Sequence, residues 1–269
     1  MTDDSQFSND FFVAPGERDP LRAARESGRP PLPKRFYEVA AAVAAGDGFG
    51  VALDRRSVKT PAKHLLAVPS RALAEALAAE WARQGAQIDP ADMPLTRLVN
   101  SALDGVALRS AEVEADVVKF AASDLVCYRA GEPASLVAAQ TLAWDPLLRF
   151  VKDRLGARFT LAEGVMFTAQ PDSAIAAIAA AVRAQVGAGP AAPLRLAGLH
   201  AMTALTGSVV IALAVASREI DAAAGWAAAH VDEDYQLKTW GSDEEAMQRR
   251  SARWREMAAA AQLFELSAG

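Results

Sequence analysis

The spacing of hydrophobic and polar positions changes along the chain at about residue 70. Before this point, short apolar segments are separated by turn residues such as Gly46-Asp47-Gly48. The alternation of Phe49, Val51 and Leu53 is typical of a half-buried strand. We therefore expect a small layer of antiparallel strands in this part of the chain.

From Ser70 onward the apolar positions follow a helical period. Ser70 is expected to cap a helix whose apolar stripe contains Leu73, Leu77 and Trp81. Thr96 is expected to cap a long helix that extends to Phe120, and Pro133 suits the first turn of another. The pattern predicts further helices over Asp172 to Val186, Leu194 to Ser217, Asp221 to Trp240 and Glu244 to Leu266.

These elements predict an α+β fold, in which a small N-terminal antiparallel β-containing domain is followed by a larger all-helical domain. We expect a β-rich domain over residues 34–95 and a helical domain over residues 96–269. Residues 1–33 are expected to form a mobile arm, because prolines interrupt them and their charges are segregated. Residues 1–20 carry five acids and one base, whereas residues 21–35 carry five bases and one acid.

The composition narrows the possible functions. The net charge of −5 argues against a nucleic-acid partner, which would favour a basic face. Continuous apolar runs such as Val209 to Ala216 are much shorter than the ~20 residues of a membrane span. Cys127 is the only cysteine, so the chain can form neither an internal disulfide nor a cysteine metal cage. The N-terminus lacks the basic region of a signal peptide, and we expect a cytoplasmic protein.

No motif for catalysis or cofactor binding is complete. Gly46, Gly48 and Gly50 resemble a nucleotide-binding loop, but Val51 holds the place of the third glycine, so a hairpin turn is the better interpretation. His230 and Glu233 could give two metal ligands one helical turn apart, which is too few for a site. The sequence therefore predicts no cofactor, no metal site, no catalytic residue and no enzymatic activity.

Glu233 is the most unusual candidate residue. If residues 221–240 form one helix, a carboxylate lies within a stripe that also contains Trp226, His230, Leu237 and Trp240. One interpretation pairs Glu233 with Arg249 or Lys238 inside the fold. A second makes it a general acid with a raised pKa. A third, which we favour, makes it a recognition carboxylate at a protein surface, with contact area from Tyr235 and Trp240.

The same segment carries a sequence motif that is typical of a protein family. It reads DExYQ, three residues, WGxDxEA and then RR, and consists of Asp232, Glu233, Tyr235, Gln236, Trp240, Gly241, Asp243, Glu245, Ala246, Arg249 and Arg250. Further blocks precede it in order, including RFY from Arg35, VKTPA from Val58, IDPxxMPLTRL from Ile88, DLVCYRA from Asp124, WDP from Trp144 and TGSVVIALA from Thr206. Together they resemble the assembly chaperones of F-type ATP synthase that escort the alpha subunit of the catalytic head (assembly factor, type two).

The resemblance implies an ATP-independent chaperone that binds the unassembled alpha subunit and releases it to beta. It also implies that the helical domain carries the contact, and the partner-binding residues we expect are Glu233, Tyr235, Gln236, Trp240 and Asp243. Eukaryotic members act in the mitochondrial matrix, whereas this chain is expected to be a bacterial, monomeric and cytoplasmic version without nucleic-acid or membrane partners. The alternative is a small-molecule enzyme with an acidic site around Asp232, Glu233 and Asp234.

Overall fold

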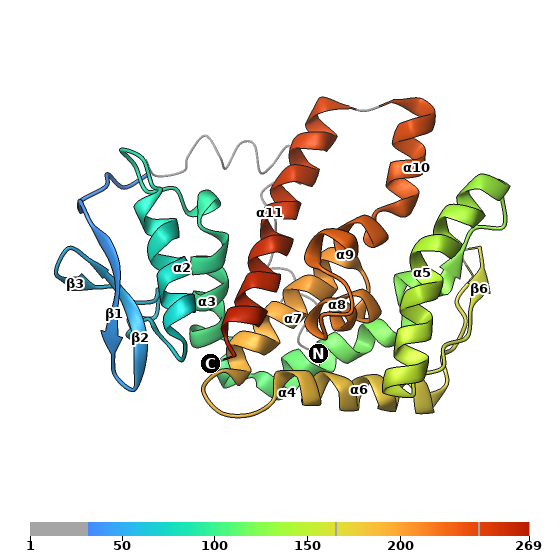
Figure 1. Cartoon of the computed structure of the whole chain (residues 1–269), viewed down its shortest axis with the longest axis horizontal. Helices are drawn as coiled ribbons and strands as arrows, with labels where there is room; N and C mark the ends of the chain where they lie inside the picture. Colours follow the sequence, from blue (N-terminus) through green and yellow to red (C-terminus); the bar gives the residue numbers. More distant parts are fainter. Residues whose placement is uncertain (1–31, 165, 242, 269) are drawn as a thin grey trace, which may run out of the picture.

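The computed structural model describes residues 32–164, 166–241 and 243–268, and Figure 1 shows its arrangement. A small antiparallel sheet with one covering helix lies at one side, and the remaining helices form the rest of the molecule. The α+β prediction is confirmed. The predicted arm over residues 1–33 lies outside the described residues except for its last two positions, and the division into domains at residue 95 stays a prediction.

The sheet is built on one hairpin. Strands β1 (Ala40–Ala45) and β2 (Gly48–Leu53) pair antiparallel, with Ala45 opposite Gly48. Gly46 turns the chain with a φ of +58°, which glycine adopts without the steric cost that a Cβ would add. Strands β3 (Arg56–Ser57) and β4 (Ala67–Val68) both pair with β2. The glycine-rich segment is therefore a hairpin turn followed by a strand, as predicted.

Helix α2 (Arg71–Ala82) covers the sheet. The Ser70 side chain accepts the backbone N–H of Leu73 at 3.0 Å, which confirms the predicted N-cap. Leu73 and Leu77 are fully buried between the helix and β1 and β2. The Tyr37 hydroxyl donates to the carbonyl of Trp81 at 2.7 Å and fixes the chain that leads into β1.

The remaining elements are mostly helical. The α-helices are α3 (Pro94–Asp104), α4 (Ser110–Lys119), α5 (Ala134–Leu155), α6 (Asp172–Val186), α7 (Ala192–Thr206), α8 (Val209–Ala216), α9 (Ala222–Ala229), α10 (Val231–Trp240) and α11 (Glu244–Leu266). Short 3-10 helices are η2 (Pro90–Asp92), η3 (Val106–Leu108), η4 (Phe120–Ser123) and η5 (Leu125–Cys127). Strands β5 (Tyr128–Arg129) and β6 (Ala162–Glu163) form a short parallel pair.

The long helix predicted from Thr96 to Phe120 is wrong. Helix α3 begins at Pro94, two residues earlier, and ends before Gly105, which has non-helical backbone angles. The N–H of Thr96 is accepted by the Glu80 carboxylate of α2, so Thr96 lies in the first turn and is not the cap. After Gly105 the chain forms η3 and then α4, so the predicted apolar seam is divided between two helices.

Two further predicted helices are each broken in two. Between α7 and α8, Gly207 has a φ of +67°, and the Ser208 side chain then accepts the N–H of Ile211 as the cap of α8. Between α9 and α10, His230 leaves the helical region with φ −117° and ψ 21°. Helix α5, in contrast, continues through Pro146, and Asp145 within it forms an ion pair with Arg129.

The core of the helical part lies around α7 and α8, most of whose residues are buried. Helix α11 runs beside α7 and also contacts α2, α3, α8 and α9 (Figure 1). Gly198 of α7 lies so close to α11 that an added Cβ would meet the carbonyl oxygen of Ala260 at 2.8 Å. Through this contact the long helix α11 is fixed to the core, and its N-terminal end carries α10 beside it.

Candidate partner-binding site

Helix α10 is attached to α5 by two side-chain hydrogen bonds. The buried amide of Gln140 donates to Asp232 at 2.8 Å, and its oxygen accepts the N–H of Ala130 at 2.8 Å. The hydroxyls of Ser135 and Tyr235 lie 2.8 Å apart. Because these contacts use the side of α10 that bears Asp232 and Tyr235, that side is not available to a partner.

A second side of α10 is attached to α11. Arg250 donates to the carboxylate of Asp234, and its side chain is largely buried in doing so. At the start of α11, the two carboxylate oxygens of Asp243 accept the N–H groups of Glu245 and Ala246, both at 3.3 Å. Asp243 is thus an N-cap that defines how the chain enters α11.

The third side of α10 faces outward and bears Glu233, Gln236 and Trp240. At 3.6 residues per turn these positions fall within about 60° of one another around the helix axis. The side chain of Glu233 is 59% exposed and Trp240 is 81% exposed. Of the five residues predicted to bind a partner, three therefore share one exposed face, and Tyr235 and Asp243 make contacts within the protein that hold this face in place.

The predicted stripe from Trp226 to Trp240 is wrong. Because the helix breaks at His230, Trp226 and His230 are buried and their ring centroids lie 3.8 Å apart. His230 Nδ1 also lies 2.7 Å from the carbonyl oxygen of Trp226. The two residues therefore belong to the core below α10 and do not continue the exposed face of Glu233.

The interpretation that pairs Glu233 with Arg249 or Lys238, one of the three left open by the sequence, does not match the pairs found. Glu233 Oε2 lies 3.8 Å from His230 Nε2, and Arg249 pairs with Glu245 at 2.8 Å. Burial lowers the pKa of His230 and outweighs the carboxylate of Glu233, which favours the charged ring. At neutral pH the imidazole of His230 is therefore uncharged and does not neutralise the charge of Glu233.

The acidic residues of α10 do not converge on one point. Asp232 faces α5, Asp234 faces Arg250 of α11, and Glu233 faces outward between them. Within residues 32–164, 166–241 and 243–268, no group of three histidine, cysteine, aspartate or glutamate side chains is placed to hold a metal ion. An enzyme would need the carboxylates directed at a common substrate, so this arrangement gives the alternative interpretation no support.

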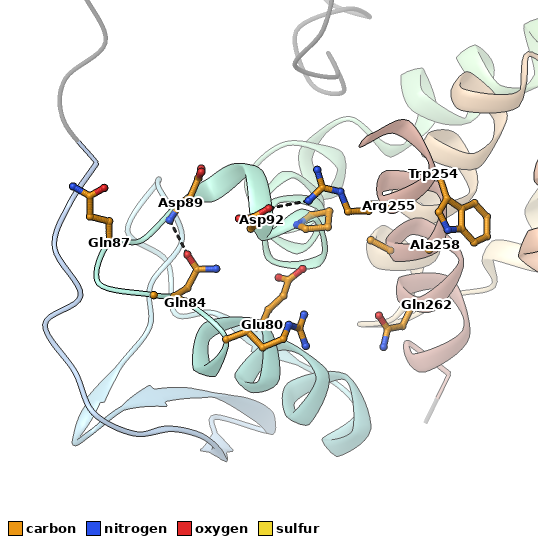
Figure 2. A pocket seen from close by; sticks show the side chains of 13 residues that line it. Glu80, Gln84, Gln87, Asp89, Asp92, Trp254, Arg255, Ala258 and Gln262 are labelled. Carbon is orange, nitrogen blue, oxygen red and sulfur yellow. Dashed lines mark hydrogen bonds and ion pairs between the residues drawn. The ribbon is translucent and has the colours of Figure 1, made fainter. Parts of the chain in front are cut away.

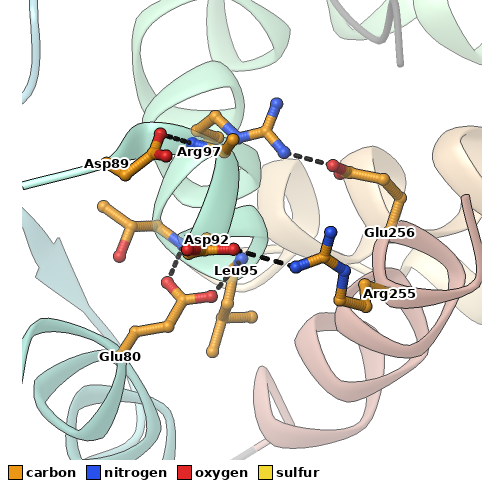
Figure 3. A network of polar contacts seen from close by, with 9 residues as sticks. Glu80, Asp89, Asp92, Leu95, Arg97, Arg255 and Glu256 are labelled. Atoms are coloured by element: carbon orange, nitrogen blue, oxygen red, sulfur yellow. Dashed lines mark hydrogen bonds and ion pairs between the residues drawn. The ribbon is translucent and has the colours of Figure 1, made fainter. Parts of the chain in front are cut away.

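A second polar region, which the sequence did not predict, lies between α2, α3 and α11. A cavity of about 510 Å³ lies there. Figure 2 shows Glu80 and Asp92 on one side of it and Trp254 on the other, with Arg255 reaching from α11 toward Asp92. Figure 3 shows the network around it. Arg255 donates to Asp92 at 2.8 Å, and Arg97 of α3 pairs with Glu256 of α11. No local spacing indicates this site, because its walls come from segments about 160 residues apart.

Comparison with known proteins gives the family. The model of the ATP12 chaperone protein family matches residues 34–152. The crystal structure of Atp12 from Paracoccus denitrificans has 34% sequence identity and a TM-score of 0.79, over 87% of this chain and 98% of that one. Atu1473, a candidate chaperone from Agrobacterium tumefaciens, has 44% identity and a TM-score of 0.83, over 96% of this chain and 94% of that one. The chain belongs to the ATP12 chaperone family.

Membership of the ATP12 chaperone family confirms the resemblance predicted from the ordered sequence blocks. The family match ends at residue 152, so it covers the sheet and α2 to α5 but does not reach α10. The partner-binding role of Glu233, Tyr235, Gln236, Trp240 and Asp243 therefore stays a prediction. Among the described helices, none is both long and apolar enough to cross a membrane.

Proposed function

We propose that this ATP12-family chaperone binds the unassembled alpha subunit of F-type ATP synthase and releases it when the beta subunit pairs with it. A free subunit exposes apolar surface that its neighbours cover in the finished complex, and such surface promotes aggregation. Binding the folded subunit stabilises it by mass action, so the process needs neither ATP nor a cofactor and involves no catalysed reaction.

The observation that carries this proposal is the exposed face of α10. The indole of Trp240 is 81% exposed on a helix that α5 and α11 hold from two other sides. Tryptophan is enriched among the residues that dominate binding energy, and a helix already held in place loses little conformational entropy on binding. Beside it, the carboxylate of Glu233 is suited to a basic group of the partner, which would add specificity.

Release follows from the small, partly polar character of this face. An interface centred on Glu233, Gln236 and Trp240 would be of moderate size. The alpha subunit would therefore dissociate from the chaperone readily when beta competes for the same surface. We propose one copy of the chaperone for each alpha subunit. The relatives from Paracoccus denitrificans and Agrobacterium tumefaciens are bacterial, which supports placing this exchange in a bacterial cytoplasm.

The test is co-elution of the full chain with purified alpha subunit on a sizing column, without nucleotide and with or without beta. We expect a complex that dissolves when beta is added. Glu233→Lys and Trp240→Ala should each weaken the complex by at least about tenfold, which corresponds to roughly 1.4 kcal/mol. Both side chains are exposed, so both variants should keep the melting temperature of the parent protein.

Glu219→Lys is the matched control, because Glu219 is also an exposed acid and lies in the turn before α9. This variant makes the same change in net charge and should bind alpha like the parent protein. If Glu219→Lys weakens binding as much as Glu233→Lys does, the effect comes from overall charge and the proposed face is wrong. If the folded parent forms no complex, the proposed partner is wrong.

A further inference from the structure

A second cavity, of about 720 Å³, lies where the C-terminal half of α11 meets α7 and the turn between α8 and α9. Its walls are mainly apolar, with larger side chains from Met202, Val215 and Ile220. Short side chains leave the space open, and these are Ala216, Ala222, Ala258, Ala261 and Ala268. Pockets of about 300–1,000 Å³ with mostly apolar walls are typical of sites for small organic ligands.

Among the described residues, four charged side chains line this cavity, and three of them are already used within the fold. Arg218 and Glu265 pair with each other at 3.2 Å, and Asp221 accepts the N–H of Ala224 at 2.7 Å as the cap of α9. Arg195 of α7 is different, because it forms no ion pair within the described part of the chain. Burial lowers the pKa of Arg195, and no carboxylate offsets this effect. An arginine nevertheless stays charged at neutral pH, so the cavity holds a positive charge without an internal partner.

The guanidinium of Arg195 is held in one orientation by its neighbours. Its Nε donates to the carbonyl of Gln185 at 2.7 Å, and its central carbon lies 4.4 Å from the ring centroid of Phe264. The side-chain amide of Gln185 donates in turn to the hydroxyl of Ser217 at 2.8 Å, which joins the end of α6 to the end of α8. Among the described residues, no acceptor lies within hydrogen-bond distance of either η nitrogen of Arg195. These two donors are therefore available to a ligand.

A carboxylate is the group that best fits the free end of this guanidinium. Two parallel N–H donors match the two oxygens of a carboxylate, and hydrogen bonds between charged groups are stronger than those between neutral ones. A phosphate dianion carries more charge than the single unpaired arginine balances. The apolar walls favour a hydrocarbon or aromatic body for the rest of the ligand, because a second polar group would lie there without a partner.

We propose that the cavity between α7, the α8–α9 turn and α11 binds an organic acid with one carboxylate and an apolar body. The carboxylate accepts hydrogen bonds from the η nitrogens of Arg195, and the body packs against Val215, Ile220 and the alanines of α11. A free aliphatic acid and the C-terminal residue of a peptide both offer this chemistry. The proposal does not depend on the alpha subunit being the partner, since the exposed face of α10 does not line this cavity.

Calorimetric titration of the full chain with two pairs of probes tests this proposal. Octanoate and 1-octanol share an apolar tail, so the difference between their affinities measures the contribution of the carboxylate. An acetylated tripeptide that ends in leucine, with a free or an amidated C-terminus, makes the same comparison for a peptide. We expect at least one of the two acids to bind one-to-one and at least about tenfold more tightly than its neutral counterpart. The acid that does so identifies the source of the ligand.

Arg195→Met removes the guanidinium and keeps an apolar side chain beside Phe264, so it should lower the affinity for the acid by at least about tenfold. Arg149→Met is the matched control, because Arg149 is exposed on α5, does not line the cavity and changes the net charge equally. If Arg195→Met lowers the melting temperature, Arg195→Lys replaces it. Lysine keeps the charge but lacks the planar pair of donors, so binding should still be weaker than in the parent protein.

Three results would overturn the proposal. The first is that the folded parent protein binds neither acid more tightly than its neutral counterpart. The second is that a folded Arg195 variant binds the acid as tightly as the parent protein does. The third is that Arg149→Met weakens binding as much as the Arg195 variant, because the effect would then come from overall charge and not from the cavity.

Discussion

At the residue scale, Asp124 shows how a carboxylate can organise a buried junction. It is fully buried after η4, its Oδ1 accepts the N–H of Val126 at 3.2 Å, and its Oδ2 accepts the N–H of Val210 at 3.1 Å. Val210 belongs to the first turn of α8, whose free N–H groups favour an acceptor. Burial nevertheless outweighs these hydrogen bonds and raises the pKa of Asp124 to about 6.

This shift predicts a specific pH dependence of stability. A carboxyl group whose pKa is higher in the folded than in the unfolded protein stabilises the fold below its unfolded pKa, and that contribution is lost as the pH rises through about 6. The free-energy advantage of the parent protein over Asp124→Asn should therefore grow by about 2.4 kcal/mol as the pH falls from about 7.5 to about 4. Urea unfolding of both proteins at several pH values measures it. A constant difference would show that the pKa of Asp124 is unchanged on folding.

At the element scale, local sequence signals predicted helices well and their interruptions poorly. The bounds of α6 and α11 agree with the prediction, because each has a continuous pattern between clear ends. The helices predicted across Gly105, Gly207 and His230 are broken there, although apolar spacing continues on both sides. At Thr206-Gly207-Ser208 the signal was present: a glycine ends one helix and a serine caps the next. At His230 neither a glycine nor a proline marks the break, and the His230 ring packs on Trp226 only four residues earlier.

The break at Gly207 predicts unequal effects of two glycine substitutions. Gly207 has a positive φ and no atom within 4 Å of an added Cβ, so Gly207→Ala should cost about 1–2 kcal/mol through backbone strain alone. Gly85 has the same open surroundings without a positive φ. Gly85→Ala should therefore be neutral or stabilising by up to about 1 kcal/mol. Thermal unfolding of both variants makes the comparison, and an equal loss in both would contradict the strain argument.

At the scale of the whole molecule, contacts between distant segments determine which side chains of the candidate site stay exposed. The motif lies on a segment with an exposed face, which Glu233, Gln236 and Trp240 share. It did not indicate which motif residues are used internally, since the partners Gln140 and Ser135 lie about 100 residues earlier in α5. The cavity beside Glu80 was missed for the same reason. Such pairings depend on the packing of the chain, which spacing along the sequence does not specify.

Glu80 provides the corresponding test of how the sheet region and the helical region are joined. It lies on α2, is 3% exposed, and accepts the N–H groups of Leu95 and Thr96 at the start of α3, each at 2.8 Å (Figure 3). Glu80→Ala leaves both buried donors without an acceptor and should cost about 3 kcal/mol. Glu75→Ala removes an exposed carboxylate of the same helix, which pairs with Arg71 one turn earlier, and should cost less than about 0.5 kcal/mol.

The regions that lose hydrogen-exchange protection in Glu80→Ala show whether Glu80 stabilises the sheet region alone or the whole fold. The strands β1 and β2 pack on α2, and α2 reaches the helices through α3 and α11. If residues 34–95 form a domain of their own, loosening the joint at Glu80 should let that domain open before the rest. In Glu80→Ala, amide hydrogens of β1 and β2 should then exchange faster while those of α7 and α8 keep their protection. Equal acceleration in both regions would mean that the sheet and the helices unfold as one cooperative unit, and that the predicted boundary at residue 95 does not separate two domains.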